Sequence, residues 1–446
     1  MIPFWLIVAI AAVILVVIGV VAGNTRTQES GVDPSPQTPT QTRYDTLAEK
    51  LAADSQRSVR HAIASNPEAP ASVLELLAGD ADEPVRKAVA MNTGAPSDLL
   101  ESITHDESPF VREGVAMNTS APGRILQRLS ERDQPLHVRK CVASNENTPA
   151  QILEYLSEEY PLEVAGNPGA PGRLLEVLAA DGDDDPTDPF APNPREFVAQ
   201  NPRTPTHLLE ELAGDRNGSV RAGVQINPST PSHVLEAYYG VSERMRQRAA
   251  ETGGEGSYEP DLAEQLFRES KGIRGRIGEN PSTPSWVLEE LSSDSAPNVR
   301  VGVAKNGNAP TEAFERLARD TDPNVRTAVA FNGSTPSRLL VKLARDAESA
   351  VRRGVASNAN TPASTLVELA ADEEQMVRGF VAGNKNTPVE TLVLLSRETG
   401  GTFTRQDVAR NPSTPVSILI DMADDDYAGI RADVARNPNI RNIYLK

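Results

Sequence analysis

The chain has 446 residues and a net charge of −18, with 44 Lys and Arg against 62 Asp and Glu, and only 4% of its residues are aromatic. A basic or aromatic surface for nucleic acid is therefore not expected. The single cysteine, Cys141, excludes an intrachain disulfide and cannot by itself hold an iron–sulfur cluster or a Cys-rich zinc site. The composition points away from an enzyme, and we expect no catalytic, cofactor-binding or metal-binding residues.

The N-terminal segment is apolar. Residues 2–22 carry no charged side chain, and the first charged side chain is that of Arg26. A helix of this length spans about 31 Å, which matches a hydrocarbon core of about 30 Å. We therefore predict a transmembrane helix over residues 1–23. The alternative is a cleaved secretory signal, but the segment is long for one and no basic stretch precedes it.

The next segment, residues 24–46, is rich in Pro, Thr and Gln and has no apolar periodicity. Such a composition cannot bury a core, so we expect a solvated tether. No Lys or Arg precedes the apolar segment, whereas Arg26 follows it directly. The positive-inside rule then predicts a single-pass protein of the cell membrane with its body on the cytoplasmic side.

From about residue 47 to residue 446 the sequence repeats itself, as in VRKAVAMNTGAPSDLLESITHD (85–106) and VRTAVAFNGSTPSRLLVKLARD (325–346). The gap between Asn227 and Asn280 is twice the usual interval of 26 or 27 and predicts an eroded repeat over about 241–266, giving about fifteen repeats. The end units are expected to lack one neighbour, and the last has Arg441 where the others have Pro. One asparagine marks each clear unit: Asn66, Asn92, Asn118, Asn145, Asn167, Asn201, Asn227, Asn280, Asn306, Asn332, Asn358, Asn384, Asn411 and Asn437.

Each unit indicates two short helices. The segment VRxxVA places apolar residues at helical spacing on the first helix. We expect the asparagine to end it in the left-handed conformation, and the following Thr-Pro to start the second helix with Thr as its N-cap. Leu339, Leu340 and Leu343 give the second helix an apolar stripe, which only stacking of the units can bury.

The pattern VRxxVAxNxxTPxxxLxxLAxD resembles the leucine-rich repeat variant (LRV) family, and its Asp-to-Arg spacing resembles HEAT-type repeats. The resemblance covers roughly residues 47–440 and implies an all-α, right-handed α-solenoid of alternating short α and 3₁₀ helices. The family's founding type carries an N-terminal cysteine cluster that binds an iron–sulfur centre. Here the apolar segment and the tether occupy that place, so no iron–sulfur cluster is expected.

Arg stands six residues before the asparagine in all clear units except that of Asn167, and an Asp often stands six residues before the Arg. We interpret these residues as a structural ladder between repeats, with Arg bonded to carboxylate and backbone oxygens, rather than as an anion-binding surface. The asparagines are interpreted as closing the turns between helices. The ladder residues singled out are Arg86, Asn92, Arg112, Asn118, Arg300, Asn306, Arg326, Asn332, Arg352 and Asn358.

The residue directly before each asparagine varies from Phe to Arg, while the core positions vary little. Variation on a repeated frame is how solenoids adapt a binding surface, so this position predicts partner contacts on the concave surface. Drift at a tolerant exposed position explains the variation equally well. The apolar members predicted to contact a partner are Met91, Met117, Ile226 and Phe331.

Other candidates are weaker. Cys141 occupies a slot for small residues and is expected to be buried and inert. His207 and His233 occupy equivalent positions in adjacent repeats, but the pattern offers too few further ligands for a metal. The acidic insert over 181–194 has Asp spacing like a calcium loop but lacks its glycine and its last acidic ligand, so a solvated loop is expected.

These observations favour a membrane-anchored, non-enzymatic repeat scaffold that binds other proteins, with the membrane contacted through one N-terminal helix. Two alternatives stay open. One is a ligand- or metal-binding module that uses the acidic insert. The other is a redox or maturation protein related to iron–sulfur LRV proteins, against which the missing cysteines count.

Overall fold

The computed structural model describes residues 46–180, 193–240, 260–398 and 401–443. The chain divides into two units, Met1–Arg43 and Tyr44–Lys446, and the described residues all belong to the second. These residues form helices joined by turns, with no strand among them. None of the helices within the described ranges is both long enough and apolar enough to cross a bilayer. The predicted transmembrane helix lies outside the described residues, as does the predicted tether up to residue 45.

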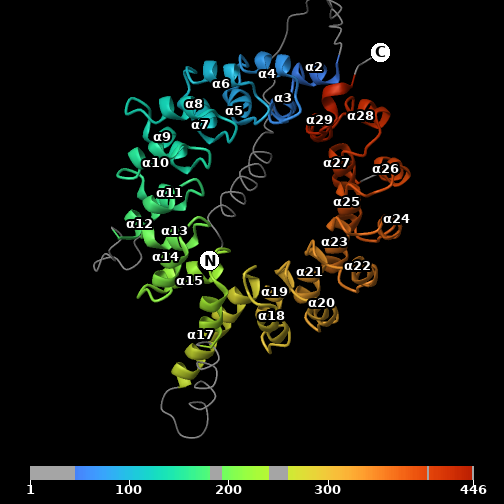
Figure 1. Ribbon diagram of the computed structural model, residues 1–446. Helices are drawn as coiled ribbons and strands as arrows, with labels where there is room; N and C mark the ends of the chain where they lie inside the picture. The colour runs from blue at the N-terminus through green and yellow to red at the C-terminus, as the bar shows by residue number, and fades with distance from the viewer. Residues whose placement is uncertain (1–45, 181–192, 241–259, 399–400, 444–446) are drawn as a thin grey trace, which may run out of the picture. The chain divides into compact units, whose positions relative to one another are not determined.

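Each repeat has a first helix that ends one or two residues before its asparagine. First helices of adjacent repeats pack against one another, as α5 does on α7 and α21 on α23 (Figure 1). They are α3 (Arg57–Ala64), α5 (Glu83–Met91), α7 (Pro109–Met117), α9 (Leu136–Ser144), α11 (Pro161–Gly166), α13 (Pro194–Gln200), α15 (Gly218–Ile226), α17 (Pro260–Glu279), α19 (Pro297–Lys305), α21 (Pro323–Phe331), α23 (Ser349–Ser357), α25 (Gln375–Gly383), α27 (Thr402–Arg410) and α29 (Ala428–Ala435).

The second helices lie outside the row of first helices in Figure 1 and have fewer contacts with one another. Residues 232–240 are also helical and occupy the same place in their repeat. The second helices are α2 (Leu47–Ala52), α4 (Ala71–Leu77), α6 (Ser97–Ile103), α8 (Gly123–Leu129), α10 (Ala150–Leu156), α12 (Gly172–Ala180), α14 (Thr206–Leu212), α18 (Ser285–Leu291), α20 (Thr311–Leu317), α22 (Ser337–Leu343), α24 (Ala363–Leu369), α26 (Val389–Ser396) and α28 (Val416–Met422), and a 3₁₀ turn, η1 (Ile440–Asn442), follows α29.

The apolar spacing of the sequence explains the core. In the repeat of α21 and α22, Val325 and Val329 are fully buried from the first helix, and the leucine stripe of the second helix is buried beside them. Burial of each such side chain contributes about 1.5–3 kcal/mol. In half of the clear units, that of Asn358 included, the fourth residue before the asparagine is Ala or Gly, and neighbouring first helices approach closely there. A Cβ on Gly354 would stand 2.7 Å from the Cβ of Ala330.

Three local predictions are wrong. Asn332 has extended backbone, with φ −72° and ψ 121°, and its backbone N–H donates to the carbonyls of Ala328 and Val329 at the end of α21. Thr335 is not an N-cap, since its hydroxyl donates to the carbonyl of Val329 at 2.6 Å and Pro336 takes the cap position. The second helices are α-helical, and among the described residues only η1 is a 3₁₀ helix.

The first and last described segments together form one repeat. Helix α29 supplies the first helix, and α2 takes the place of the second, with the N–H of Leu47 donating to the carbonyl of Ile443 at 3.0 Å. Leu47 and Leu51 are buried in this composite repeat, and α29 packs on α3 (Figure 1). The expectation that the end units lack a neighbour is therefore wrong. The repeats of Tyr44–Lys446 close into a ring.

The ring has fourteen asparagine-bearing layers. The side chain of Asn280 donates directly to the carbonyls of Gln225 and Asn227, at 2.8 and 3.0 Å, so α17 stacks on α15. Of the predicted eroded repeat over about 241–266, residues 241–259 lie outside the described ranges and 260–266 belong to α17, which has 20 residues.

Candidate functional site

The asparagines form a continuous hydrogen-bonded ladder, called the asparagine ladder below. The Nδ2 of Asn118 donates to the carbonyls of Ala90 and Asn92 in the preceding repeat, both at 2.8 Å, and its Oδ1 accepts the N–H of Ser120. Each side chain thus closes its own turn and also joins two repeats. Among the described residues the same donation to a preceding carbonyl occurs at all fourteen positions: Asn66, Asn92, Asn118, Asn145, Asn167, Asn201, Asn227, Asn280, Asn306, Asn332, Asn358, Asn384, Asn411 and Asn437.

A second row, the arginine ladder, runs parallel to it. Arg326 donates through Nε and Nη2 to the carboxylate of Asp346 at 2.7 and 2.9 Å, and through Nη1 to the carbonyl of Asp320 at 2.8 Å. Arg86, Arg300 and Arg352 make the same contacts with their own aspartates. Arg112 differs, since its Nε donates to the amide oxygen of Gln134 at 3.3 Å and its Nη1 to the carbonyl of Asp106.

The arginine ladder shifts the pKa of its carboxyl groups. Burial by itself raises the pKa of Asp346, but hydrogen bonds from Arg326 and from the N–H of Glu348, together with the charges of Arg326 and Arg352, bring the pKa below its ordinary value. A carboxyl with a lowered pKa stabilises the folded state above its unfolded pKa of about 3.9. That contribution is lost as the pH falls through the lower pKa of the folded state.

Both ladders pass through the junction of α29 with α3, which we call the seam. The side chain of Asn66 donates to the carbonyls of Ala435 and Asn437 at 2.7 and 3.0 Å. Arg431 donates to the carboxylate of Asp54 at 2.9 and 3.2 Å, while Arg60 donates to the Asp54 carbonyl. The seam therefore repeats the contacts of the other layers between residues far apart in the sequence.

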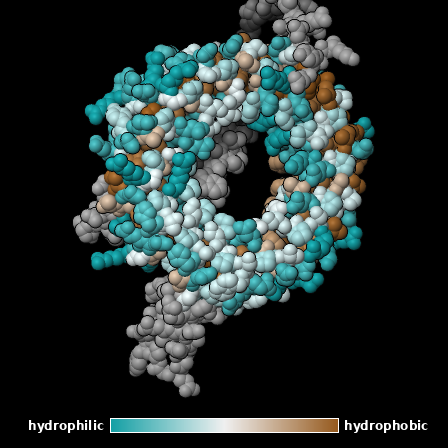
Figure 2. All heavy atoms as spheres, viewed as in Figure 1, coloured by the Kyte–Doolittle hydropathy of each residue, from teal (hydrophilic) through white to brown (hydrophobic). Residues whose placement is uncertain are grey.

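A face of the first helices points away from the core. At about 100° per residue, the first, fifth and eighth residues before each ladder asparagine lie opposite the buried third and seventh. The second helices lie on the core side, so these residues line the inner side of the ring, and we call them the lining face. Figure 2 shows an opening there, with hydrophobic residues in separate groups among hydrophilic ones.

The predicted contact residues belong to the lining face. Met91, Met117, Ile226 and Phe331 each end a first helix and are 42%, 41%, 43% and 49% exposed. Phe110, the eighth residue before Asn118, is 53% exposed. These five large apolar side chains are therefore available for contact on the lining face.

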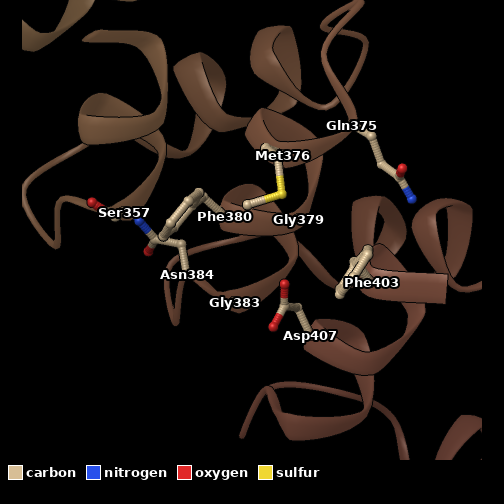
Figure 3. A pocket seen from close by; sticks show the side chains of 9 residues that line it. All are labelled: Ser357, Gln375, Met376, Gly379, Phe380, Gly383, Asn384, Phe403 and Asp407. Atoms are coloured by element: carbon tan, nitrogen blue, oxygen red, sulfur yellow. The ribbon is translucent and has the colours of Figure 1, made fainter. Parts of the chain in front are cut away.

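The lining face is hollowed between α23, α25 and α27. A cavity of about 280 Å³ is lined by Ser357, Gln375, Met376, Gly379, Phe380, Gly383, Asn384, Phe403 and Asp407. Figure 3 shows Met376 and Phe380 from α25 on one side, Phe403 from α27 on another, and the Asp407 carboxylate below them. Burial raises the pKa of Asp407 to about 6, with the charge of Asp433 raising it further and that of Arg410 opposing this.

The other predicted candidates are placed apart from the lining face. Cys141 is partly buried, and burial raises its pKa to about 11, as expected of an unreactive thiol. His207 and His233 each lie beside a glutamate of the preceding second helix, with Nε2 to Oε1 distances of 3.2 Å to Glu176 and 3.1 Å to Glu210. Of the acidic insert, residues 181–192 lie outside the described residues. No group of three or more potential metal ligands occurs in the described ranges.

The sequence analysis missed Asp407, Met376 and Phe403. The signal for Asp407 is its slot, the fourth residue before the asparagine, which holds Ala or Gly in seven of the fourteen clear units. The signal for Met376 and Phe403 is their shared position eight residues before an asparagine, where Phe110 also stands. This position lies seven residues before the one next to the asparagine, and at about 100° per residue the two share one face of the helix.

These contacts define the chain as a helical repeat solenoid. No protein-family model matches it, and neither does any curated protein. Similar solved structures include a leucine-rich repeat variant with a novel repetitive structural motif, 21% identical, which covers 57% of this chain and 89% of its own with a TM-score of 0.33. An engineered protein is 15% identical over 89% of this chain and 98% of its own, with a TM-score of 0.20. A chain from the Pds5–Scc1 complex is 13% identical over 87% of this chain and 66% of its own, with a TM-score of 0.18.

Proposed function

We propose that this protein is a non-enzymatic scaffold that binds a partner protein through its lining face. The observation that carries the proposal is that Met91, Phe110, Met117, Ile226 and Phe331 are large apolar side chains exposed on the lining face. Each such side chain adds about 1.5–3 kcal/mol when a partner covers it. The net charge of −18 and the low aromatic content of 4% favour protein over nucleic acid as the partner.

Photo-crosslinking in cells tests this. A photoreactive residue at position 331 should form a discrete crosslinked product, and Met91→Asp with Met117→Asp in the same chain should reduce it about tenfold or more, because a charge replaces buried apolar contact. Leu76 and Leu394 are matched controls, being 63% and 66% exposed on the second helices α4 and α26. A product that forms equally at position 394, or that survives the lining substitutions, would contradict the proposal.

We also propose that residues 1–23 anchor the scaffold in the cell membrane, with the repeats on the cytoplasmic side. The support is the uncharged stretch over residues 2–22 and the position of Arg26 after it. A C-terminal tag should stay with the membrane after alkaline washing and resist protease in intact cells, and should be digested once the cells are permeabilised. Digestion in intact cells would reverse the orientation. A tagged product released from the membrane would indicate a cleaved signal instead.

A further inference from the structure

Two glycines create the cavity on the lining face. Gly379 and Gly383 stand five residues and one residue before Asn384, and in α25 both of these lining positions therefore lack a side chain. A Cβ on Gly383 would meet nothing within 4 Å. Neither glycine has the positive φ that would require glycine for the backbone. The backbone thus tolerates larger residues at Gly383, and the glycine leaves open space instead.

The carboxylate of Asp407, which lines this cavity, accepts few hydrogen bonds from the described residues. Asp433 occupies the equivalent slot in the next repeat, and its carboxylate accepts from Gln406, Arg410 and Arg436 at 2.8, 2.8 and 2.7 Å. Among the described residues, Asp407 accepts only one long hydrogen bond, from Nη1 of Arg410 at 3.4 Å. The two aspartates share a position, but only Asp433 has its acceptors filled by the protein.

We infer that the cavity binds a cationic side chain, lysine or arginine, of a partner protein. The alkyl stem would lie along Met376 and Phe403, which are 48% and 64% exposed, and the charged group would reach Asp407 (Figure 3). A cation satisfies the free acceptor of a half-buried carboxylate, and nearby aromatic faces also attract it. The cavity is at the small end of ligand sites, which suits one side chain better than a cofactor.

The lining of the cavity offers no other charge to Asp407 from α23 or α25. The charged groups near it are Arg410 on the same helix α27 and Asp433 of α29, and Asp433 is paired with Arg410 and Arg436. Because the pKa of Asp407 lies at about 6, the carboxylate is ionised at pH 7.5 and largely protonated at pH 5. Binding of the cation should therefore weaken as the pH falls through this range.

The test uses N-acetyl-lysine methylamide as a probe, with N-acetyl-norleucine methylamide as its neutral analogue, and titrates the full-length chain by saturation-transfer NMR. The wild-type chain should bind the lysine probe and prefer it to the neutral one. Asp407→Asn should weaken binding about tenfold or more, since a hydrogen bond to a charged group is lost. Gly383→Met should abolish binding by filling the cavity. Gly333→Met is the matched control, because a Cβ there also meets nothing within 4 Å and lies outside the cavity lining.

Equal binding by wild type and Gly383→Met would overturn the inference, and so would equal binding of the two probes. Circular dichroism melting of the variants should match that of wild type, which separates loss of the cavity from loss of the fold. The inference rests on the proposed scaffold function but is tested without the partner. Crosslinks at position 331 without binding of the lysine probe would leave the scaffold function standing and remove only the cationic pocket.

Discussion

Replacing Asp54 with arginine is expected to open the ring. The substitution places a third cation between Arg431, which pairs with the Asp54 carboxylate, and Arg60, which donates to the Asp54 carbonyl. The pair is partly buried, with 16% and 12% of the two side chains exposed, and removal of one partner from a fully buried pair costs about 3–5 kcal/mol, so a somewhat smaller loss is expected here. Small-angle X-ray scattering should show a larger radius of gyration than that of wild type.

Two control variants separate opening of the seam from a general loss of stability. Asp346→Arg breaks an equivalent rung, Arg326 to Asp346 at 2.7 Å, between repeats that the chain itself joins. It should lower the melting temperature without enlarging the particle. The charge swap Asp54→Arg with Arg431→Asp should recover most of the compact form. An unchanged radius for Asp54→Arg, or an equal increase for Asp346→Arg, would show that the seam does not depend on this pair.

Removal of one asparagine from the interior of the asparagine ladder is expected to destabilise the chain by about 2–3 kcal/mol. Asn118→Ala leaves the carbonyls of Ala90 and Asn92 and the N–H of Ser120 without their partner, and the asparagine is only 1% exposed. A buried polar group without a partner costs about 1–3 kcal/mol. Urea unfolding followed by circular dichroism measures the loss.

The comparison for this substitution is Asn360→Ala. Asn360 also donates its Nδ2 to a backbone carbonyl of the preceding repeat, that of Gly333 at 2.6 Å, but in an exposed position where water can replace it. Its loss should cost less than about 1 kcal/mol. Similar values for the two variants would mean that burial of the ladder contributes little to stability.

The two-helix unit could be predicted from sequence because the valines and leucines that form its core repeat at helical spacing. The function of Asn332 and Thr335 could not be predicted as easily. Both residue types are common at helix ends, and their hydrogen bonds with other parts of the backbone appear only when the repeats are stacked. Phe110 and Phe403 could be assigned to the lining face only from the bounds of α7 and α27, which show that they share a helix face with the residue before the asparagine.

Closure of the ring was missed for a different reason. The angle between successive repeats is small and accumulates over many layers, so no single unit of sequence specifies it. One signal was nevertheless present. LAEKLAAD (47–54) aligns with LLVKLARD (339–346), the second helix of a repeat, but no VRxxVA segment precedes it in the sequence. The unit that contains Arg441 has a first helix, α29, but no second helix follows it among the described residues. Helix α2 takes that place.

The composite repeat also orders the events of biosynthesis. Helix α2 is among the first folded parts to leave the ribosome, whereas its partner α29 is made more than 370 residues later, as the separation of 377 between Asp54 and Arg431 indicates. Until then Leu47 and Leu51 have no complete core to enter. A chain that lacks α29 therefore leaves part of the apolar surface of α2 uncovered, and apolar surface that stays exposed during folding favours aggregation.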